Sequence, residues 1–247
     1  MKMARSARQK SITNIYHVML RGINRQQIFL DDEDNRMFLM TLEKCREISG
    51  FHLYAYVLMG NHVHILLQTV EEPLEQVMKR VGTRYALWYN NKYCRTGHLF
   101  QDRYRSEPVQ DQDYFLTVLR YILYNPVKAG ICRLAEDYPF SSAKDYFSGG
   151  EISETAFAEG IAGRDALLEY LKEPSDEECM DDTRARVNDK EALEIIRKIT
   201  GGEETSAGLR MVADYPGQYV WPLRKAGLSI RQISRLTGLS IGIVRNK

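Results

Sequence analysis

Two imidazoles stand two residues apart in the apolar run Gly60-Asn61-His62-Val63-His64-Ile65-Leu66-Leu67. In a β-strand, side chains at positions i and i+2 point to the same face, about 6.6 Å apart at the usual rise per residue. Both histidines can therefore turn toward one divalent metal ion or one phosphate, while Val63 and Ile65 pack on the other face. A buried structural pair of histidines is the alternative interpretation of this run.

The same run forms the second half of a predicted β-hairpin. Aromatic and aliphatic residues fill the preceding segment, Leu53-Tyr54-Ala55-Tyr56-Val57-Leu58-Met59, and predict its first strand. Gly60-Asn61 supplies a two-residue turn between the two strands. The sequence therefore predicts a hairpin over residues 51–68.

A helix that starts near Asp111 carries the next candidate residues. Apolar residues recur in it at the three- and four-residue spacing of a buried helix face: Phe115, Leu116, Val118, Leu119, Ile122 and Leu123. Pro126 disfavours the helical conformation at Asn125, so the helix is expected to end there. Tyr121 and Asn125 are four residues apart and share one face of the last turn. This pair offers a nucleophile beside a metal ligand, or simply a packed tyrosine and a capping asparagine.

The first 150 residues alternate between strand-like and helix-like segments. Strands are expected at residues 15–20 and in the hairpin, helices at residues 32–49 and 74–89, and an extended segment or hairpin at residues 98–110. This order suits an antiparallel sheet with helices packed to one side. We therefore expect an α+β fold of the ferredoxin-like type.

Four motifs, taken together and in this order, resemble the single-tyrosine HUH transposases, especially the branch called REP-associated tyrosine transposases. The resemblance runs from about Ser11 to about Tyr146. The motifs are Tyr16-His17-Val18-Met19-Leu20-Arg21-Gly22-Ile23-Asn24-Arg25, Asn61-His62-Val63-His64, Gly97-His98-Leu99-Phe100-Gln101-Asp102-Arg103-Tyr104-Arg105 and Tyr121-Ile122-Leu123-Tyr124-Asn125-Pro126-Val127-Lys128-Ala129-Gly130.

The resemblance implies a role for each residue that matches the family's motifs. His62 and His64 would bind a divalent metal ion, Asn125 would complete the metal site, and Tyr121 would attack DNA. Some relatives carry Gln at the position of Asn125. Tyr124 is a second phenol nearby, and the sequence leaves it open as an alternative nucleophile. The family also implies the ferredoxin-like fold.

The implied reaction needs these residue types. A free tyrosine has a pKa near 10, so only about one in a thousand is ionised at neutral pH. An adjacent cation can favour the phenolate and withdraw charge from the scissile phosphate. Attack by Tyr121 would leave a 5′-phosphotyrosine and a free 3′-hydroxyl, and the step can later reverse on another end without ATP. Two nitrogens and one oxygen suit Mg²⁺ or Mn²⁺, whereas a zinc site would want a third histidine or a carboxylate.

Single-stranded or hairpin DNA is the partner that this interpretation implies. Basic residues that can contact its phosphates follow the first strand, precede the tyrosine helix, end that helix and lie near the end of the chain: Arg21, Arg25, Arg103, Arg105, Lys128, Arg231, Arg235 and Arg245. Salt-bridged surface arginines are the alternative for any single one. A homodimer and a monomer are both compatible with relatives of this kind.

Charge is distributed unevenly along the chain, although the net charge is only +1. Residues 1–150 hold 20 Lys and Arg against 16 Asp and Glu, residues 151–209 hold 7 against 16, and residues 210–247 hold 7 against 1. Gly149-Gly150 marks a domain edge. We therefore expect a catalytic domain over 1–150, an acidic helical spacer over 151–209 and a basic DNA-binding region over 210–247.

The basic end of the chain has the pattern of a helix-turn-helix. Ser229-Ile230-Arg231-Gln232 forms a capping box that opens a short helix. Gly238 then supplies a turn, and Ser240 can cap a second helix. An ordinary helical hairpin is the alternative, because the second helix has only about eight residues before Lys247.

Composition is that of an ordinary globular enzyme. The chain has 247 residues, of which 44% are hydrophobic and 27% charged. No apolar run approaches the roughly 20 residues of a membrane span, and the basic N-terminus lacks the apolar core of a signal peptide. Four scattered cysteines form no C-x-x-C pair, which indicates a reducing compartment. We expect a cytoplasmic protein with no membrane partner.

Two further interpretations of the function stay open. One is a sequence-specific DNA-binding regulator with a vestigial HUH domain. The other is a metal-dependent nuclease that forms no covalent intermediate. A DNA-linked tyrosine would distinguish a transposase from both.

Overall fold

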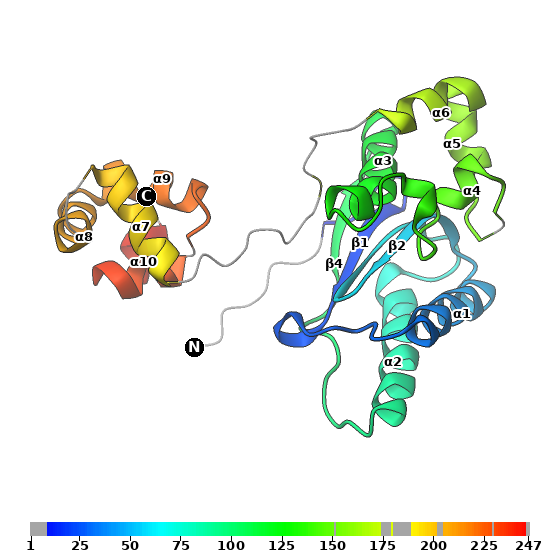
Figure 1. Cartoon of the computed structure of the whole chain (residues 1–247), viewed down its shortest axis with the longest axis horizontal. Coiled ribbons are helices and arrows are strands. Elements are labelled where there is room, and N and C mark those ends of the chain that lie inside the picture. The colour runs from blue at the N-terminus through cyan, green and yellow to red at the C-terminus, as the bar shows by residue number, and fades with distance from the viewer. Residues whose placement is uncertain are drawn as a thin grey trace. The chain divides into compact units, whose positions relative to one another are not determined.

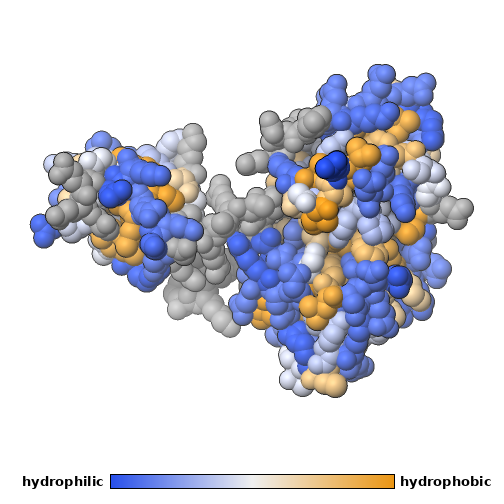
Figure 2. Space-filling model, viewed as in Figure 1, coloured by the Kyte–Doolittle hydropathy of each residue, from blue (hydrophilic) through white to orange (hydrophobic). Residues whose placement is uncertain are grey.

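The computed structural model describes residues 9–150, 152–173, 179, 189–201, 205–228 and 230–245. The chain divides into two compact units, Met1–Met180 and Asp181–Lys247 (Figure 1). Hydrophilic residues cover most of the face of each unit that is seen in Figure 2, with apolar residues showing between them.

A four-stranded antiparallel sheet forms the centre of the first unit. Its strands are β1 (Ile15–Arg21), β2 (His52–Met59), β3 (His62–Gln68) and β4 (Arg105–Val109), in the order β2-β3-β1-β4. The predicted hairpin is confirmed as β2 and β3, which pair directly across the turn at Gly60 and Asn61. The fold is therefore of the mixed α+β class, as expected.

Helices α1 (Asp32–Ser49) and α2 (Leu74–Lys92) cover one face of this sheet (Figure 1). Alternate strand residues such as Val63 and Ile65 pack there against helical residues such as Phe38 and Val81. Asp31 caps the start of α1, because its side chain accepts a hydrogen bond from the Asp34 backbone amide, and Gly50 ends that helix with a φ of 62°.

Helix α3 (Gln112–Lys128) covers the opposite face, so the expectation that all helices lie to one side was wrong. The apolar faces of α3 and of the sheet meet through residues such as Phe115, Val118 and Val57. The reason lies in β2, where every residue after His52 is buried: a strand buried on both faces needs cover on both.

Residues 152–172 also belong to the first unit, whereas the sequence placed a domain edge at Gly149-Gly150. Helices α5 (Ala156–Ala162) and α6 (Arg164–Lys172) bury Ala158, Leu167 and Leu171 in the same cluster as α3. The Glu154 backbone amide donates to the Leu53 carbonyl at 2.8 Å, which ties this segment to β2. Shorter elements complete the unit: η1 (Ile23–Arg25), η2 (Ala135–Asp137) and α4 (Ala143–Phe147).

The second unit is a bundle of short helices. They are α7 (Asp189–Thr200), α8 (Thr205–Asp214), α9 (Pro216–Lys225), α10 (Ile230–Thr237) and α11 (Ile241–Arg245). Its core joins Ile196 of α7 to Val212 of α8, Val220 of α9 and Ile233 of α10. The expected boundary at residue 209 therefore falls inside α8, and α7 is part of the bundle rather than of a spacer. No described helix is long and apolar enough to cross a membrane.

Candidate active site

His62 and His64 lie on the face of β3 that α3 covers, as the two-residue spacing predicted. The residues between and after them, Val63 and Ile65, are buried in the cluster under α1 and α2. The two imidazole rings have centroids 5.1 Å apart and stand nearly perpendicular. The predicted alternation is therefore confirmed: the two histidines share one face of β3, and Val63 and Ile65 share the other.

A third histidine, which sequence reasoning did not select, completes the cluster. His17 lies on β1, next to β3, and its Nε2 is 2.9 Å from Nδ1 of His64. Both rings are fully buried. His17 was visible in the motif Tyr16-His17-Val18, but only the pairing of β1 with β3 brings it to His64.

The hydrogen bond between His17 and His64 occupies Nδ1 of His64 and leaves its Nε2 as the other ring nitrogen. Nε2 of His64 is buried and has no hydrogen-bond partner among the described residues. When Nδ1 of His64 donates to His17, Nε2 carries a lone pair and can bind a metal ion. A buried polar atom without a partner costs free energy unless a ligand satisfies it, so this atom fits the expected metal.

Electrostatics keep His64 in the neutral form that a metal ligand needs. Burial lowers its pKa well below the ordinary value, and charge on His17 and His62 lowers that pKa further. Arg21 and Arg105 act on the same pKa in the same direction. The positive charge of both arginines therefore reaches the histidine cluster. Arg21 of β1 also lies directly opposite His62 of β3 in the sheet.

Tyr121 of α3 is the phenol that meets the histidines. Its ring centroid lies 5.5 Å from that of His64 and 5.8 Å from that of His17, with edge-to-face geometry in both cases. Only 7% of Tyr121 is exposed. Tyr124 is engaged elsewhere, because its hydroxyl donates to the Lys172 carbonyl of α6 at 2.8 Å. The geometry therefore favours Tyr121 over Tyr124 as the nucleophile.

Asn125 lies one turn beyond Tyr121 on α3, and its amide nitrogen approaches the Tyr121 carbonyl at 3.4 Å. The helix does not end at Asn125 as expected but continues through Pro126 to Lys128. Proline removes one backbone donor, and in the last turn that loss is small because the Ala129 amide still donates to the Asn125 carbonyl. Among the described residues, no group of three or more His, Cys, Asp or Glu side chains is placed to hold a metal ion. Asn125 stays the third ligand that the sequence predicts beside His62 and His64.

The other basic residues predicted to contact DNA have different surroundings. Arg25 lies in the turn η1 after β1, Lys128 is exposed at the end of α3, and Arg103 is exposed at the mouth of a pocket on the opposite face of the sheet from the histidines. Arg235 makes a two-pronged ion pair with Asp189, at 2.5 and 2.6 Å, which holds α10 to α7. The side chains of Arg231 and Arg245, and the whole of Ser229, lie outside the described residues.

The fold and the site together match one family of DNA transposases. Residues 10–125 match the family model described as "Transposase IS200 like". This segment holds the entire sheet, the three histidines and Tyr121. Residues 10–125 are therefore similar to the IS200-like transposases, and the resemblance to REP-associated tyrosine transposases is confirmed.

Two relatives show how far the likeness extends. A protein of Haemophilus influenzae described as a REP-associated tyrosine transposase is 27% identical over 131 residues, which are 48% of this chain and 73% of the relative. A solved structure of a REP-associated tyrosine transposase bound to a REP hairpin is 18% identical, with a TM-score of 0.51. The match covers 62% of this chain and 94% of that one, and it shows that the fold is shared.

Proposed function

We propose that this chain is a single-strand DNA endonuclease and strand transferase that works through a 5′-phosphotyrosine on Tyr121. One observation carries the proposal: the Tyr121 ring lies against His64, whose Nε2 is buried without a partner among the described residues. Metal-assisted phosphoryl transfer needs a nucleophile next to a side-chain atom that can bind the metal, and Tyr121 and Nε2 of His64 provide these two groups.

Each residue of the site has a defined part in this reaction. Oη of Tyr121 would bond to phosphorus while the 3′-oxygen of the neighbouring nucleotide leaves and takes up a proton. His62, His64 and Asn125 would hold Mg²⁺ or Mn²⁺, which would favour the phenolate and withdraw charge from the phosphate. His17 would keep His64 oriented through its Nδ1. Attack by a free 3′-hydroxyl on the phosphotyrosine reverses the step and joins strands.

Single-stranded or hairpin DNA is the proposed substrate. Arg21 and Arg105 both lower the pKa of His64, and these two cations near the site are the proposed contacts to DNA phosphates. The solved relative is described as bound to a REP hairpin, which supports a hairpin as the form of DNA recognised. We also propose that the protein works in the cytoplasm. A homodimer remains part of the proposal, and sedimentation would test it.

Finer features of the fold support the same proposal. In the first unit, β1, α1, β2, β3, α2 and β4 follow one another with sheet order β2-β3-β1-β4, which is the arrangement that a ferredoxin-like fold requires. In the second unit, α10 and α11 meet at Gly238, whose φ is 76°, and the Ser240 hydroxyl accepts a hydrogen bond from the Ile243 amide. We propose this pair as a helix-turn-helix that adds DNA affinity.

Trapping of the covalent intermediate tests the proposed reaction. A labelled hairpin-containing single strand is incubated with the protein and Mn²⁺ and then separated on a denaturing gel. We expect a band that stays shifted in detergent and disappears after protease treatment. Cleavage without that band would favour a nuclease that uses water. Binding without cleavage would favour a regulator with a vestigial catalytic domain.

A further inference from the structure

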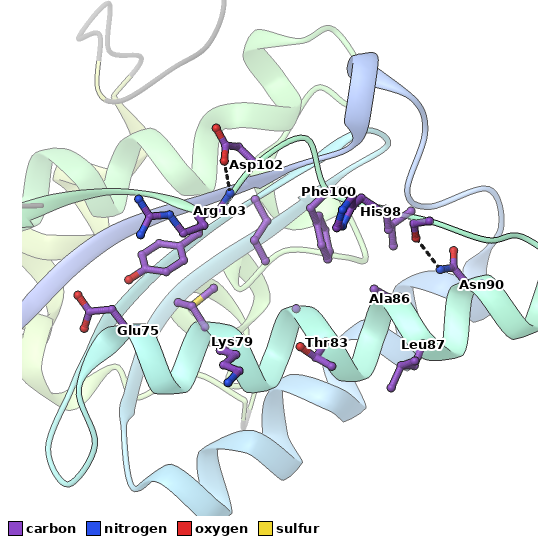
Figure 3. A pocket seen from close by; sticks show the side chains of 16 residues that line it. Glu75, Lys79, Thr83, Ala86, Leu87, Asn90, His98, Phe100, Asp102 and Arg103 are labelled. Atoms are coloured by element: carbon purple, nitrogen blue, oxygen red, sulfur yellow. Dashed lines mark hydrogen bonds between the residues drawn. The ribbon is translucent and has the colours of Figure 1, made fainter. Parts of the chain in front are cut away.

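A pocket of about 550 Å³ lies on the other side of the sheet edge from the histidines. It opens between α2 and the segment 97–104, which leads into β4 (Figure 3). Its volume falls in the range of small-molecule and cofactor sites. None of the residues assigned to the reaction above lines it, although Arg103, a predicted DNA contact, does.

The pocket combines an apolar floor with a polar rim that carries charges of both signs. Leu20, Met78 and Leu99 are buried beneath it. Phe100 is half-buried and points from the segment 97–104 toward α2 in Figure 3, so part of one wall is an aromatic ring. Exposed charged side chains surround the mouth: Lys79 and Arg103 are basic, whereas Glu75 and Asp102 are acidic.

A glycine in the middle of α2 keeps this pocket open. Glycine in a helix interior costs about 1 kcal/mol relative to alanine, so its presence there needs a reason. A Cβ at Gly82 would meet only the Phe100 ring, at 3.8 Å, which is ordinary van der Waals contact. The close packing of α2 therefore does not require a glycine at this position. A longer side chain there would extend into the pocket.

The pocket and the catalytic cluster share one edge of the sheet. The Gln101 amide donates to the Arg21 carbonyl at 2.9 Å, and the Ile23 amide donates to the Leu99 carbonyl at 2.9 Å, so the segment 97–104 runs along the end of β1. Successive side chains of an extended segment point to opposite sides. Tyr104 lines the pocket, and the next residue, Arg105, lowers the pKa of His64 on the other side of the sheet. A DNA strand that passes around β4 can therefore reach both.

We infer that this pocket binds one unpaired nucleobase of the DNA strand. A base offers a flat apolar face for Phe100 and the apolar floor, polar edges for the rim, and a neighbouring phosphate for Lys79 and Arg103. The inference rests on the proposed action on single-stranded DNA and adds a base-binding site to it. Capture of the base would hold the strand while its phosphate lies at Tyr121.

The test separates base binding from phosphate binding. Short fluorescein-labelled strands of deoxythymidine and of deoxyadenosine are compared with an abasic strand of the same length and charge, with the full chain in chelator so that no cleavage occurs. We expect the base-containing strands to bind about 5- to 150-fold tighter than the abasic strand, as one stacked base contributes.

Filling the pocket should remove that difference. In Gly82→Leu the ratio of the two affinities should fall toward one, while the affinity for the abasic strand and its salt dependence stay unchanged. Gly160→Leu is the matched control, since Gly160 is an exposed helical glycine of α5 with no atom within 4 Å of its Cβ position. Phe100→Leu keeps an apolar side chain but removes the ring, so it should lower the ratio even if Gly82→Leu does not fold.

Each other result overturns the inference in a distinct way. Equal affinity of the normal protein for base-containing and abasic strands would refute the pocket and leave the proposed function intact. Failure to bind any strand would refute DNA binding itself. A ratio that survives both substitutions would show that the bases bind elsewhere on the chain.

Discussion

Nε2 of His17 on β1 lies 2.9 Å from Nδ1 of His64 on β3, and both side chains are fully buried. This contact occupies Nδ1 of His64 and leaves Nε2 for the proposed metal. The ring nitrogen that a neighbour occupies cannot bind metal, and the hydrogen bond orients the ring; with Nδ1 of His64 as the donor, Nε2 keeps the lone pair that a metal needs. His17 is therefore a positioning residue of the proposed site.

Replacement of His17 should weaken metal binding without removing a ligand. We expect His17→Leu to lower the affinity for Mn²⁺ by about 10- to 100-fold, as loss of such a supporting hydrogen bond typically does. Isothermal titration calorimetry on the protein without DNA measures this directly. His17→Gln keeps a polar group near the position of Nε2 and should retain most of the affinity.

The Tyr121→Phe variant of the same protein is the control, because it should bind Mn²⁺ about as well as the normal chain. Unchanged metal affinity in His17→Leu would show that another group orients His64. A loss of the native circular dichroism spectrum in His17→Leu would leave His17→Gln as the informative variant.

Tyr121→Phe should abolish the covalent DNA adduct while DNA binding stays intact. The substitution removes one hydroxyl oxygen and no packing volume, so the contacts of the ring with His17 and His64 survive. Tyr124→Phe should still form the adduct, and should lose only about 1 kcal/mol of stability with its hydrogen bond to the Lys172 carbonyl. Denaturing gels and urea unfolding measure the two effects. An adduct in Tyr121→Phe that disappears in Tyr124→Phe would reverse the assignment.

The stability of the metal-free protein should fall as the pH drops below about 6.5. The pKa of His64 is lowered in the folded state, mainly by burial, whereas the unfolded chain has the ordinary value of 6.5. Between these two pKa values the unfolded chain binds the additional proton, so the free energy of unfolding rises with pH there by up to about 1.4 kcal/mol per unit. Urea unfolding in chelator between about pH 5 and 7 measures the slope. His64→Gln should reduce it, and an equal slope in both proteins would contradict this account.

The central hairpin and the orientation of its histidines could be predicted because strand periodicity is a local property. His62 and His64 face the same way whatever the rest of the sheet does. The role of His17 could not be predicted, since it depends on the register of β1 against β3, two strands separated by a helix and another strand. Local pattern alone does not encode that register.

The domain edge was misplaced because apolar packing after Gly150 is not visible in the charge pattern. Acidic composition suggested a spacer after Gly150, yet Leu167 and Leu171 form an apolar face that packs on the cluster beside α3. Arg235, which is predicted to contact DNA, also has a partner that the sequence does not reveal, because it is paired with Asp189, 46 positions earlier in the sequence. Such long-range partners become visible only when the chain is folded.

Removal of the second unit should weaken DNA binding and leave the chemistry in place. The deletion should begin at Asp181 rather than at residue 210, because loss of residues 210–247 alone would strip Ile196 of its partners in α8, α9 and α10. All the residues assigned to the reaction precede residue 130, so cleavage of a short single strand at saturating protein should persist. Affinity should fall, and the slope of log affinity against log salt should become shallower, because fewer phosphates are neutralised. Fluorescence anisotropy at several salt concentrations measures both. Unchanged affinity and slope would show that the second unit does not contact DNA, while loss of the circular dichroism spectrum of the truncated chain would show that the first unit needs the second in order to fold.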